Sequence, residues 1–294
     1  MIATIRPRAA LRRKAIRTGR MLEAFYGPPS RRRRQDALST LVQTILSQNT
    51  SDTNSHRAFE RLRSRFSSWV AVRDAPLEAV IEALRPAGLA RLKAPRIQAI
   101  LRRIAAERGA LSLDFLRRRS VEHARAWLRR LQGVGPKTAA LVLVFGLGKP
   151  AFAVDTHVYR VGRRVGLIPE GLSVDEAHGW MEALVPRDRY APFHLLLVRH
   201  GRETCKALRP CCAICPIRGL CDFFAARSKS AAVPTARRGG AAAMPQNTAE
   251  TSGGMISTHW GPRVNVTSFP SRSRRRKRSV RDVFFQVPAV ATPS

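Results

Sequence analysis

The sequence predicts an all-α protein with two helical domains and a disordered basic C-terminal tail. From about Ala15 to Arg227, apolar residues recur every three or four positions and alternating β-branched runs are few, which is typical of amphipathic helices. The chain has 294 residues, enough for roughly two domains of about 100–150 residues each. Its 44% hydrophobic content is sufficient to build their cores, so a wholly disordered chain is not expected.

The first half of the chain contains three segments with helical periodicity. Residues 37–45 form one apolar-striped helix. Residues 68–110 are expected to form two further helices, separated by a break at residues 86–88, where a proline is followed by alanine and glycine. These segments supply much of the predicted helical body.

Helix caps mark two later helices. Ser120 is a good N-cap for a helix over residues 121–131. Ser173 and Glu176 have the spacing of a capping box, and the helix that they begin is expected to stop at Pro186. The caps support the existence of these helices more strongly than the positions of their ends.

Beyond residue 227 the sequence becomes rich in Ala, Gly, Pro, Ser and Thr, so residues 228–294 are expected to be disordered. Residues 227–294 carry twelve Lys and Arg against two acids, which is +10 of the formal charge of +33 and leaves +23 on the rest of the chain. The basic block at 271–279 is equally compatible with a nonspecific nucleic-acid arm and with a solvated run of charge.

The net charge of +33 favours a densely negative partner, nucleic acid first and an anionic membrane surface second. Arginine supplies most of the charge, and such a skew can also follow from genome composition. The sequence has no run of about 18 apolar residues and no secretion signal, so we expect an intracellular protein without a membrane span. Together with the charge, this favours the cytoplasm or nucleoid, with DNA, and we expect a monomer. The Arg-rich N-terminus fits either an organelle transit peptide or a basic helix over DNA.

The segment "LRRLQGVGPKTAALVLVFGLG" predicts a tight hairpin of two helices at residues 128–148. Gly133 and Gly135 flank Val134 in a turn expected to need two residues without Cβ constraints, and Pro136 suits the first position of the next helix. Free N–H groups there would form an anion site suited to a DNA phosphate. The alternative is a plain turn between helices, and Lys137 alone is weak evidence for catalysis.

A second motif, "FAVDTHVYRVGRRVG", places Asp155 directly before a helix expected to run to Gly166. By itself Asp155 is best interpreted as an N-cap. Together, Lys137 and Asp155 supply an amine that can act as a nucleophile and a carboxylate that can stabilise positive charge. His157 and His200 are interpreted as structural.

All five cysteines lie within 17 residues, which favours a metal site over disulfides in a reducing compartment. Cys205, Cys212, Cys215 and Cys221 have the spacing C-x6-C-x2-C-x5-C, and Cys211 is left over. From ligand chemistry alone, the four thiolates could hold either zinc or an iron–sulfur cluster.

The Gly-Val-Gly-x-Lys hairpin, the Val-Asp-Thr-His-Val helix start and the cysteine spacing together resemble the endonuclease III branch of the helix-hairpin-helix DNA glycosylases. The resemblance covers residues 15–226 and implies a six-helix barrel domain, an iron–sulfur cluster domain and a DNA-binding cleft between them. The boundaries that we expect on this basis are a basic N-terminal extension at 1–14, the cluster domain at 15–36 and 149–227, the barrel at 37–148, and the tail at 228–294.

The same resemblance implies roles for individual residues. Lys137 and Asp155 would be catalytic in a DNA glycosylase and AP lyase, acting on double-stranded DNA with damaged bases, oxidised pyrimidines first, or with abasic sites. The four spaced cysteines would hold a [4Fe-4S] cluster. The remaining positions implied to contact DNA are Gln48, Asn49, Leu89, Gly133, Val134, Gly135 and Thr138.

Some of these roles have alternatives. Either Gln48 or Asn49 could enter the duplex, or both could be polar residues at a helix end, while Leu89 could be the apolar wedge or a plain core residue. For the whole protein, the alternatives are a monofunctional mismatch glycosylase acting on thymine, uracil or adenine, and a noncatalytic DNA-binding relative.

Overall fold

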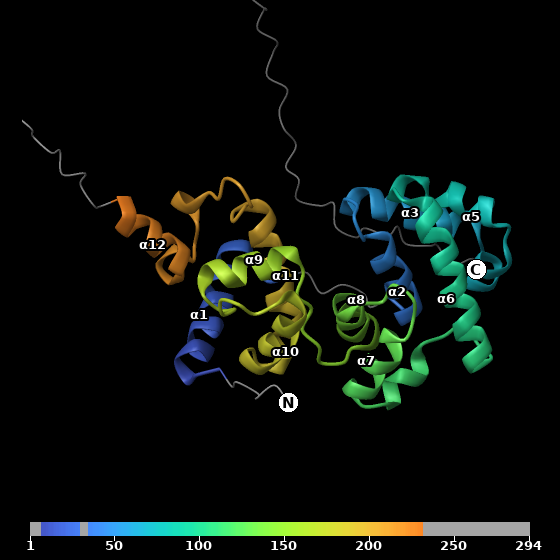
Figure 1. Cartoon of the computed structure of the whole chain (residues 1–294), viewed down its shortest axis with the longest axis horizontal. Coiled ribbons are helices and arrows are strands. Elements are labelled where there is room, and N and C mark those ends of the chain that lie inside the picture. The colour runs from blue at the N-terminus through green and yellow to red at the C-terminus, as the bar shows by residue number, and fades with distance from the viewer. Residues whose placement is uncertain (1–6, 30–34, 232–294) are drawn as a thin grey trace, which may run out of the picture. The chain divides into compact units, whose positions relative to one another are not determined.

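The computed structural model describes residues 7–29 and 35–231, all of which lie in one unit of the chain, residues 1–232. Within these ranges the structure is helical throughout its regular elements and contains no strand, which confirms the all-α prediction (Figure 1). The α-helices are α1 Ala9–Tyr26, α2 Ala37–Leu46, α3 Asp52–Arg65, α4 Trp69–Asp74, α5 Leu77–Leu84, α6 Ala90–Arg108, α7 Val121–Arg129, α8 Pro136–Leu141, α9 Thr156–Val165, α10 Val174–Leu184, α11 Tyr190–Glu203 and α12 Asp222–Ala231. The short 3-10 and π segments are η1 Arg85–Ala87, η2 Asp114–Arg118, η3 Val142–Leu147, η4 Arg187–Arg189, η5 Cys212–Ile214 and η6 Arg218–Leu220.

Both ends of the chain extend beyond the described residues. Residues 1–6 of the predicted N-terminal extension, 1–14, lie outside the described residues. The rest of the extension includes the start of α1 at Ala9. The predicted tail, 228–294, also lies outside them, apart from residues 228–231, which complete α12. The basic block at 271–279 is therefore not described.

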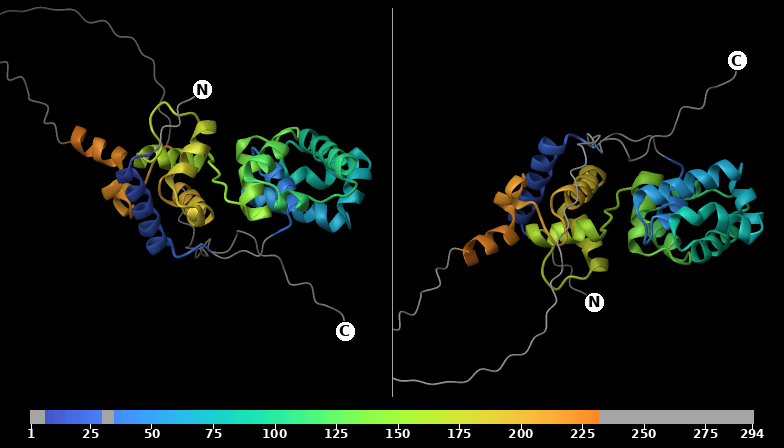
Figure 2. Two further views of the ribbon diagram at one scale, coloured as in Figure 1. Left: turned by 90° about the horizontal axis from the view of Figure 1, so that it is seen from below. Right: turned by 90° about the horizontal axis from the view of Figure 1, so that it is seen from above.

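Two hydrophobic clusters hold the described helices together. One is built from α2 to α8 with η3, and its centre includes Leu41, Ile45 and Leu101, which are fully buried or nearly so. The other joins α1 to α9, α10 and α11, with Leu22 and Phe152 at its centre. Helix α1 packs beside α11, although all the residues of the first cluster lie between these two helices in the sequence (Figure 2). The domain boundaries proposed from the sequence stay a prediction.

The predicted caps at Ser120 and Ser173 are confirmed. The Ser120 hydroxyl accepts a hydrogen bond from the His123 N–H at the start of α7. At the start of α10, Ser173 and Glu176 form the reciprocal capping box expected from their spacing. These bonds satisfy N–H groups that have no partner inside a helix.

The two-helix prediction for residues 68–110 was wrong, because α4 and α5 both precede the break and α6 follows it. The missed boundary lies at Ala75, which has an extended backbone with ψ of 151°. Its neighbour Pro76 disfavours the helical conformation for the residue before it and lacks the N–H that would continue the helix. Pro76 then becomes the N-cap of α5.

Residues 151–155 form an extended segment between the two clusters. Ala151 and Ala153 belong to the first cluster, and Phe152 and Val154 belong to the second. This alternation follows from the period of two of an extended chain. The segment ends at Asp155, so both cores fix the position of that carboxylate.

Side chains from α10 and α11 satisfy the backbone of this segment. Glu182 accepts from the Phe152 N–H at 2.9 Å, and the Nδ1 atoms of His178 and His194 lie 3.0 Å and 2.8 Å from the carbonyl oxygens of Phe152 and Ala153. The Val154 N–H also donates to Nδ1 of His178 at 3.3 Å, and the buried Nε2 of His178 has no partner among the described residues. Because buried backbone groups need partners, these side chains replace a neighbouring strand.

We expect Gly146→Ala to destabilise the protein by about 1–3 kcal/mol through overpacking. A Cβ at Gly146, in η3, would lie 2.8 Å from the Cα atom of Ala37 in α2, where only backbone could move aside. Gly179→Ala is the matched control, because its Cβ meets nothing within 4 Å in the helix α10, and it should be neutral or stabilising by about 0.5–1 kcal/mol. Urea unfolding checks both values, and equal stability of the two variants would contradict the close packing of η3 on α2.

Candidate active site

The predicted hairpin forms between α7 and α8. Gly133 has a φ of +76°, and a Cβ there would lie 2.7 Å from Cδ of Arg96, so this position requires glycine. Gly135 has a φ of −84°, and a Cβ there would meet nothing within 4 Å. The expectation that both glycines are needed for the turn was therefore wrong for Gly135. Val134 between them is 95% buried and anchors the turn in the first cluster.

Helix α8 begins at Pro136, as expected, and its first turn faces outward. Lys137 is the second residue of the helix and is exposed, whereas Thr138 is buried. Within the described residues, the N–H groups of Gly135, Lys137 and Thr138 have no hydrogen-bond acceptor. Free N–H groups at a helix start, next to a lysine, attract an anion.

Gln48 is tied to the hairpin. Its Nε2 donates to Gly133 O at 3.2 Å and to Thr138 Oγ1 at 3.3 Å, and its Oε1 accepts from Arg96 at 3.3 Å. Asn49 is exposed and has a left-handed backbone with a φ of 53°. Gln48 therefore braces the hairpin, while Asn49 is the side chain presented to solvent. Sequence reasoning did not single out Arg96.

Leu89 precedes α6 and is 51% exposed, which excludes the core interpretation. Its φ of 50° makes Leu89 and Asn49 the two non-glycine residues with positive φ among the described residues. Left-handed non-glycine residues cost energy and persist where the surrounding structure holds them, often at functional sites. Leu92, in the first turn of α6, is 61% exposed and is a second exposed apolar side chain close to Leu89 in sequence. The sequence offered no signal for Leu92.

Asp155 is 91% buried and caps α9, with its carboxylate accepting from the Val158 N–H at 2.8 Å. Burial alone would raise the pKa of Asp155, but His194, the Val158 bond, Lys137 and His157 together hold that pKa below its usual value. Burial also lowers the pKa of His194, so that imidazole is neutral near pH 7. Lys137 and the Val158 N–H are then the groups that keep Asp155 ionised.

The cysteine loop follows α11. Cys205, Cys212, Cys215 and Cys221 are half-buried and line one small cavity with apolar walls, and the exposed Cys211 lines it as well. Burial, together with the other cysteines, raises the pKa of Cys215 to about 11 and that of Cys221 above its ordinary value. Such thiols stay protonated at neutral pH unless a cationic centre binds them.

Side chains outside the cysteine loop bond to it and hold it in place. Arg164 donates to the carbonyl oxygens of Lys206 and Ala207 at 2.7 Å and to the Cys205 sulfur at 3.3 Å. His200, predicted to be structural, lies buried between the Tyr26 hydroxyl and the Cys215 sulfur. In the described part of the chain, no three His, Cys, Asp or Glu side chains are grouped so that they could hold a single metal ion. The four thiols share a cavity without forming a mononuclear site.

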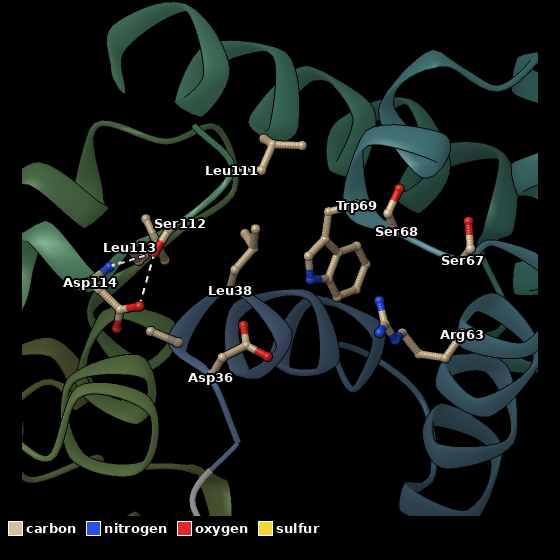
Figure 3. A pocket seen from close by; sticks show the side chains of 11 residues that line it. Asp36, Leu38, Arg63, Ser67, Ser68, Trp69, Leu111, Ser112, Leu113 and Asp114 are labelled. Atoms are coloured by element: carbon tan, nitrogen blue, oxygen red, sulfur yellow. Dashed lines mark hydrogen bonds between the residues drawn. The ribbon is translucent and has the colours of Figure 1, made fainter. Parts of the chain in front are cut away.

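A cavity of about 370 Å³ lies elsewhere, at the N-terminal end of α2 (Figure 3). Trp69, Leu38 and Leu111 contribute its apolar surface, and Asp36 and Arg63 are among its charged residues. None of the predicted site residues lines this cavity, since Gln48 and Asn49 follow the opposite end of α2.

Among the helices that the structure describes, none combines the length and the apolar composition that a membrane-spanning helix needs.

Known proteins resemble this chain in sequence and in fold. Residues 42–186 match the HhH-GPD superfamily of base excision DNA repair proteins. Endonuclease III of Thermotoga maritima is 32% identical over 201 residues, which cover 68% of this chain and 90% of that protein. A solved non-covalent complex of endonuclease III with DNA matches with a TM-score of 0.64 and 28% identity, covering 74% of this chain and 98% of that chain.

The chain therefore belongs to the HhH-GPD superfamily, as a DNA glycosylase of base excision repair. The resemblance to endonuclease III that the sequence indicated is confirmed. The structure of a thermostable thymine-DNA glycosylase has a TM-score of 0.63 at 22% identity, covering 74% of this chain and 99% of that chain. That likeness shows a shared fold alone, because one fold can serve different substrates.

We expect acid to destabilise the protein through His178 and His194. Burial lowers the pKa of both imidazoles, so the unfolded chain takes up protons below about pH 6.5 while the folded chain resists them. Their contribution is complete above that pH and is lost as the pH falls, with a slope of at most about 1.4 kcal/mol per pH unit for each histidine.

Urea unfolding between about pH 7.5 and about pH 5 measures this loss. A double variant, His178→Asn with His194→Asn, keeps an N–H donor near each carbonyl and removes the titrating rings. Its free energy of unfolding should depend less on pH than that of the wild type. An unchanged pH dependence would show that these histidines are not the groups responsible.

Proposed function

We propose that this protein is a bifunctional DNA glycosylase and AP lyase that removes damaged bases, oxidised pyrimidines first, from double-stranded DNA. The observation that carries the proposal is the pairing of Lys137 with Asp155. Lys137 is exposed on the outward first turn of α8, and its charge acts on the buried Asp155 at the start of α9. A nucleophilic amine and a fixed carboxylate are the two groups that the reaction needs.

In the proposed reaction, the unprotonated Nζ of Lys137 attacks C1′ of the flipped nucleotide. The base departs with the electrons of the glycosidic bond and takes up a proton. The sugar ring opens to leave a Schiff base between C1′ and Nζ. Loss of a proton from C2′ then breaks the C3′–O bond, so that the 3′ phosphate leaves by β-elimination.

Asp155 supports this chemistry from a fixed position. Its low pKa keeps the carboxylate ionised, which stabilises positive charge developing at C1′. The bond to Val158 N–H and the packing of residues 151–155 in two cores prevent the carboxylate from turning away. Fixed charge of this kind needs no reorganisation during the reaction.

DNA would be held by the hairpin and opened by two side chains. The free N–H groups at Gly135, Lys137 and Thr138 suit a backbone phosphate, and the open space at Gly135 leaves room for one. Asn49 and Leu89, both exposed, are the side chains that we assign to the space left by the flipped base. Gln48 is assigned a bracing role, because its amide is already bonded to the hairpin.

The cysteine loop would hold a [4Fe-4S] cluster through Cys205, Cys212, Cys215 and Cys221. The donor set fits, because the four half-buried thiols line one cavity, where burial raises the pKa of Cys215 and Cys221 so that these two ionise only beside a cation. Four cysteine thiolates are the usual ligand set of such a cluster, and the resemblance to endonuclease III favours it over a zinc ion. When bound, it would fix the loop after α11 and ionise the four thiols.

Lys137→Ala should abolish covalent trapping of the enzyme on abasic DNA by borohydride, because the adduct requires the amine. Asp155→Asn keeps an acceptor for the Val158 N–H, so it should retain DNA affinity while trapping slows by about 100-fold or more. Gel electrophoresis of the trapped adduct and a DNA-binding titration measure both effects. An adduct that persists in Lys137→Ala would overturn the mechanism, and base release without strand cleavage by the wild type would indicate a monofunctional glycosylase.

Cys212→Ser should lower the iron and sulfide content and remove the visible absorption of the purified protein, because one thiolate of the cluster is lost. Cys211→Ser is the matched control, since the adjacent Cys211 is exposed and left out of the predicted ligand set. It should retain iron and sulfide in equal amounts. Zinc in place of iron in the wild type, or equal losses in both variants, would contradict the assignment.

A further inference from the structure

Lys93 is a buried cation in the first turn of α6. It is 3% exposed, and its Nζ donates to Leu46 O at 2.8 Å and to Ala87 O at 2.9 Å. No carboxylate lies within ion-pair distance of Lys93 among the described residues. Burial, with a smaller contribution from Arg96, lowers the pKa of Lys93. Burying a cation without a counter-ion costs free energy. The two carbonyls that accept from Lys93 must therefore compensate for the lost hydration of its ammonium group.

Both acceptors are carbonyls at helix ends. Leu46 is the last residue of α2, and Ala87 is the last residue of η1. Carbonyls at a helix C-terminus lack partners within the helix and carry partial negative charge, which a cation satisfies. Lys93 therefore replaces two separate caps with one ammonium group.

The two capped ends lead directly into the two left-handed residues. Asn49 follows Leu46 by three positions, and Leu89 follows Ala87 by two. Neither has the glycine that a left-handed backbone favours, so each turn must be held by its surroundings. Because one ammonium binds a carbonyl in each turn, it fixes their separation as well as their conformations.

We propose that Lys93 is a positioning residue that holds the Asn49 and Leu89 turns at the spacing needed for both side chains to enter one lesion site. The inference rests on the proposed function and adds a residue that never touches DNA. Arg96, one turn further along α6, bonds to Gln48 and lies beneath Gly133. The start of α6 thus joins the two insertion turns to the hairpin that would hold the phosphate.

The test uses a duplex with a non-cleavable tetrahydrofuran abasic analogue and 2-aminopurine as the opposite base. Insertion of side chains unstacks the 2-aminopurine and raises its fluorescence, independently of any chemistry. At saturating wild-type protein we expect a fluorescence rise. Lys93→Met should lose most of this rise and lower the rate of strand cleavage at a natural abasic site by at least about tenfold.

Matched variants separate positioning from folding. Lys93→Arg keeps a cation with several donors and should restore most of the fluorescence rise. Lys149→Met is the control, because the Lys149 ammonium also donates to a backbone carbonyl, that of Arg119, away from both insertion turns. It should behave as the wild type. Affinity for undamaged duplex should be unchanged in all three variants, because the hairpin and surface cations supply it.

The outcomes distinguish the two proposals. A Lys93→Met protein that gives the full fluorescence rise and cleaves at the wild-type rate overturns the positioning role. A loss of fluorescence proportional to the unfolded fraction, measured by circular dichroism on the same samples, also overturns it. If Lys93→Met does not fold, failure of the folded Lys93→Arg variant to reproduce the wild-type signal decides against the proposal. A wild type that raises the fluorescence in a Lys93-dependent manner but never cleaves refutes the lyase activity alone.

Discussion

The position of Asp155 depends on the extended segment from Ala151 to Asp155. Alternate side chains of this segment are buried in two different hydrophobic clusters, so it can neither slide nor rotate without exposing apolar surface on both sides. The described part of the chain offers its backbone no neighbouring strand, and Glu182, His178 and His194 supply hydrogen-bond partners instead. A carboxylate at the end of such a segment stays in place when a substrate arrives.

The candidate site residues, Asp155 included, share a second physical feature, which is that they lie at helix ends. Asn49 follows α2, Leu89 precedes α6, Lys137 lies in the first turn of α8, and Asp155 caps α9. Helix ends present unpaired N–H or carbonyl groups, so they attract ions of a defined sign. The N-termini of α8 and α9 hold or attract anions, while the C-terminal carbonyls of α2 and η1 are neutralised by Lys93.

Charge is used differently in different parts of the protein. Most arginines of the described chain lie at the surface, whereas Lys93 is buried without a carboxylate and the buried Asp155 is influenced by the charge of Lys137. The formal charge of +33 could indicate only a nucleic-acid partner. The few buried charges give more specific information, because a charge is removed from water only where the fold compensates for the loss of hydration.

Much of the architecture could be predicted from local sequence signals. Periodicity indicated the helical body, and Ser120, Ser173, Pro136 and Asp155 marked helix starts because a cap is a bond between residues close in sequence. The Pro76 boundary was missed because the apolar periodicity continues across it. The likeness to endonuclease III was visible because three motifs with fixed spacings occur in one chain.

By itself, the sequence determined the family, the helix caps, and which residue types were available for catalysis and for a cluster. Only the tertiary structure decided that Gln48 is held by the hairpin while Asn49 is exposed, that Gly133 alone needs glycine for the turn, and that Leu92, Arg96 and Lys93 belong beside the site. The reason is distance along the chain. Lys93 bonds to a carbonyl 47 positions away and Gln48 to one 85 positions away, and no local pattern encodes contacts that exist only once the helices have packed.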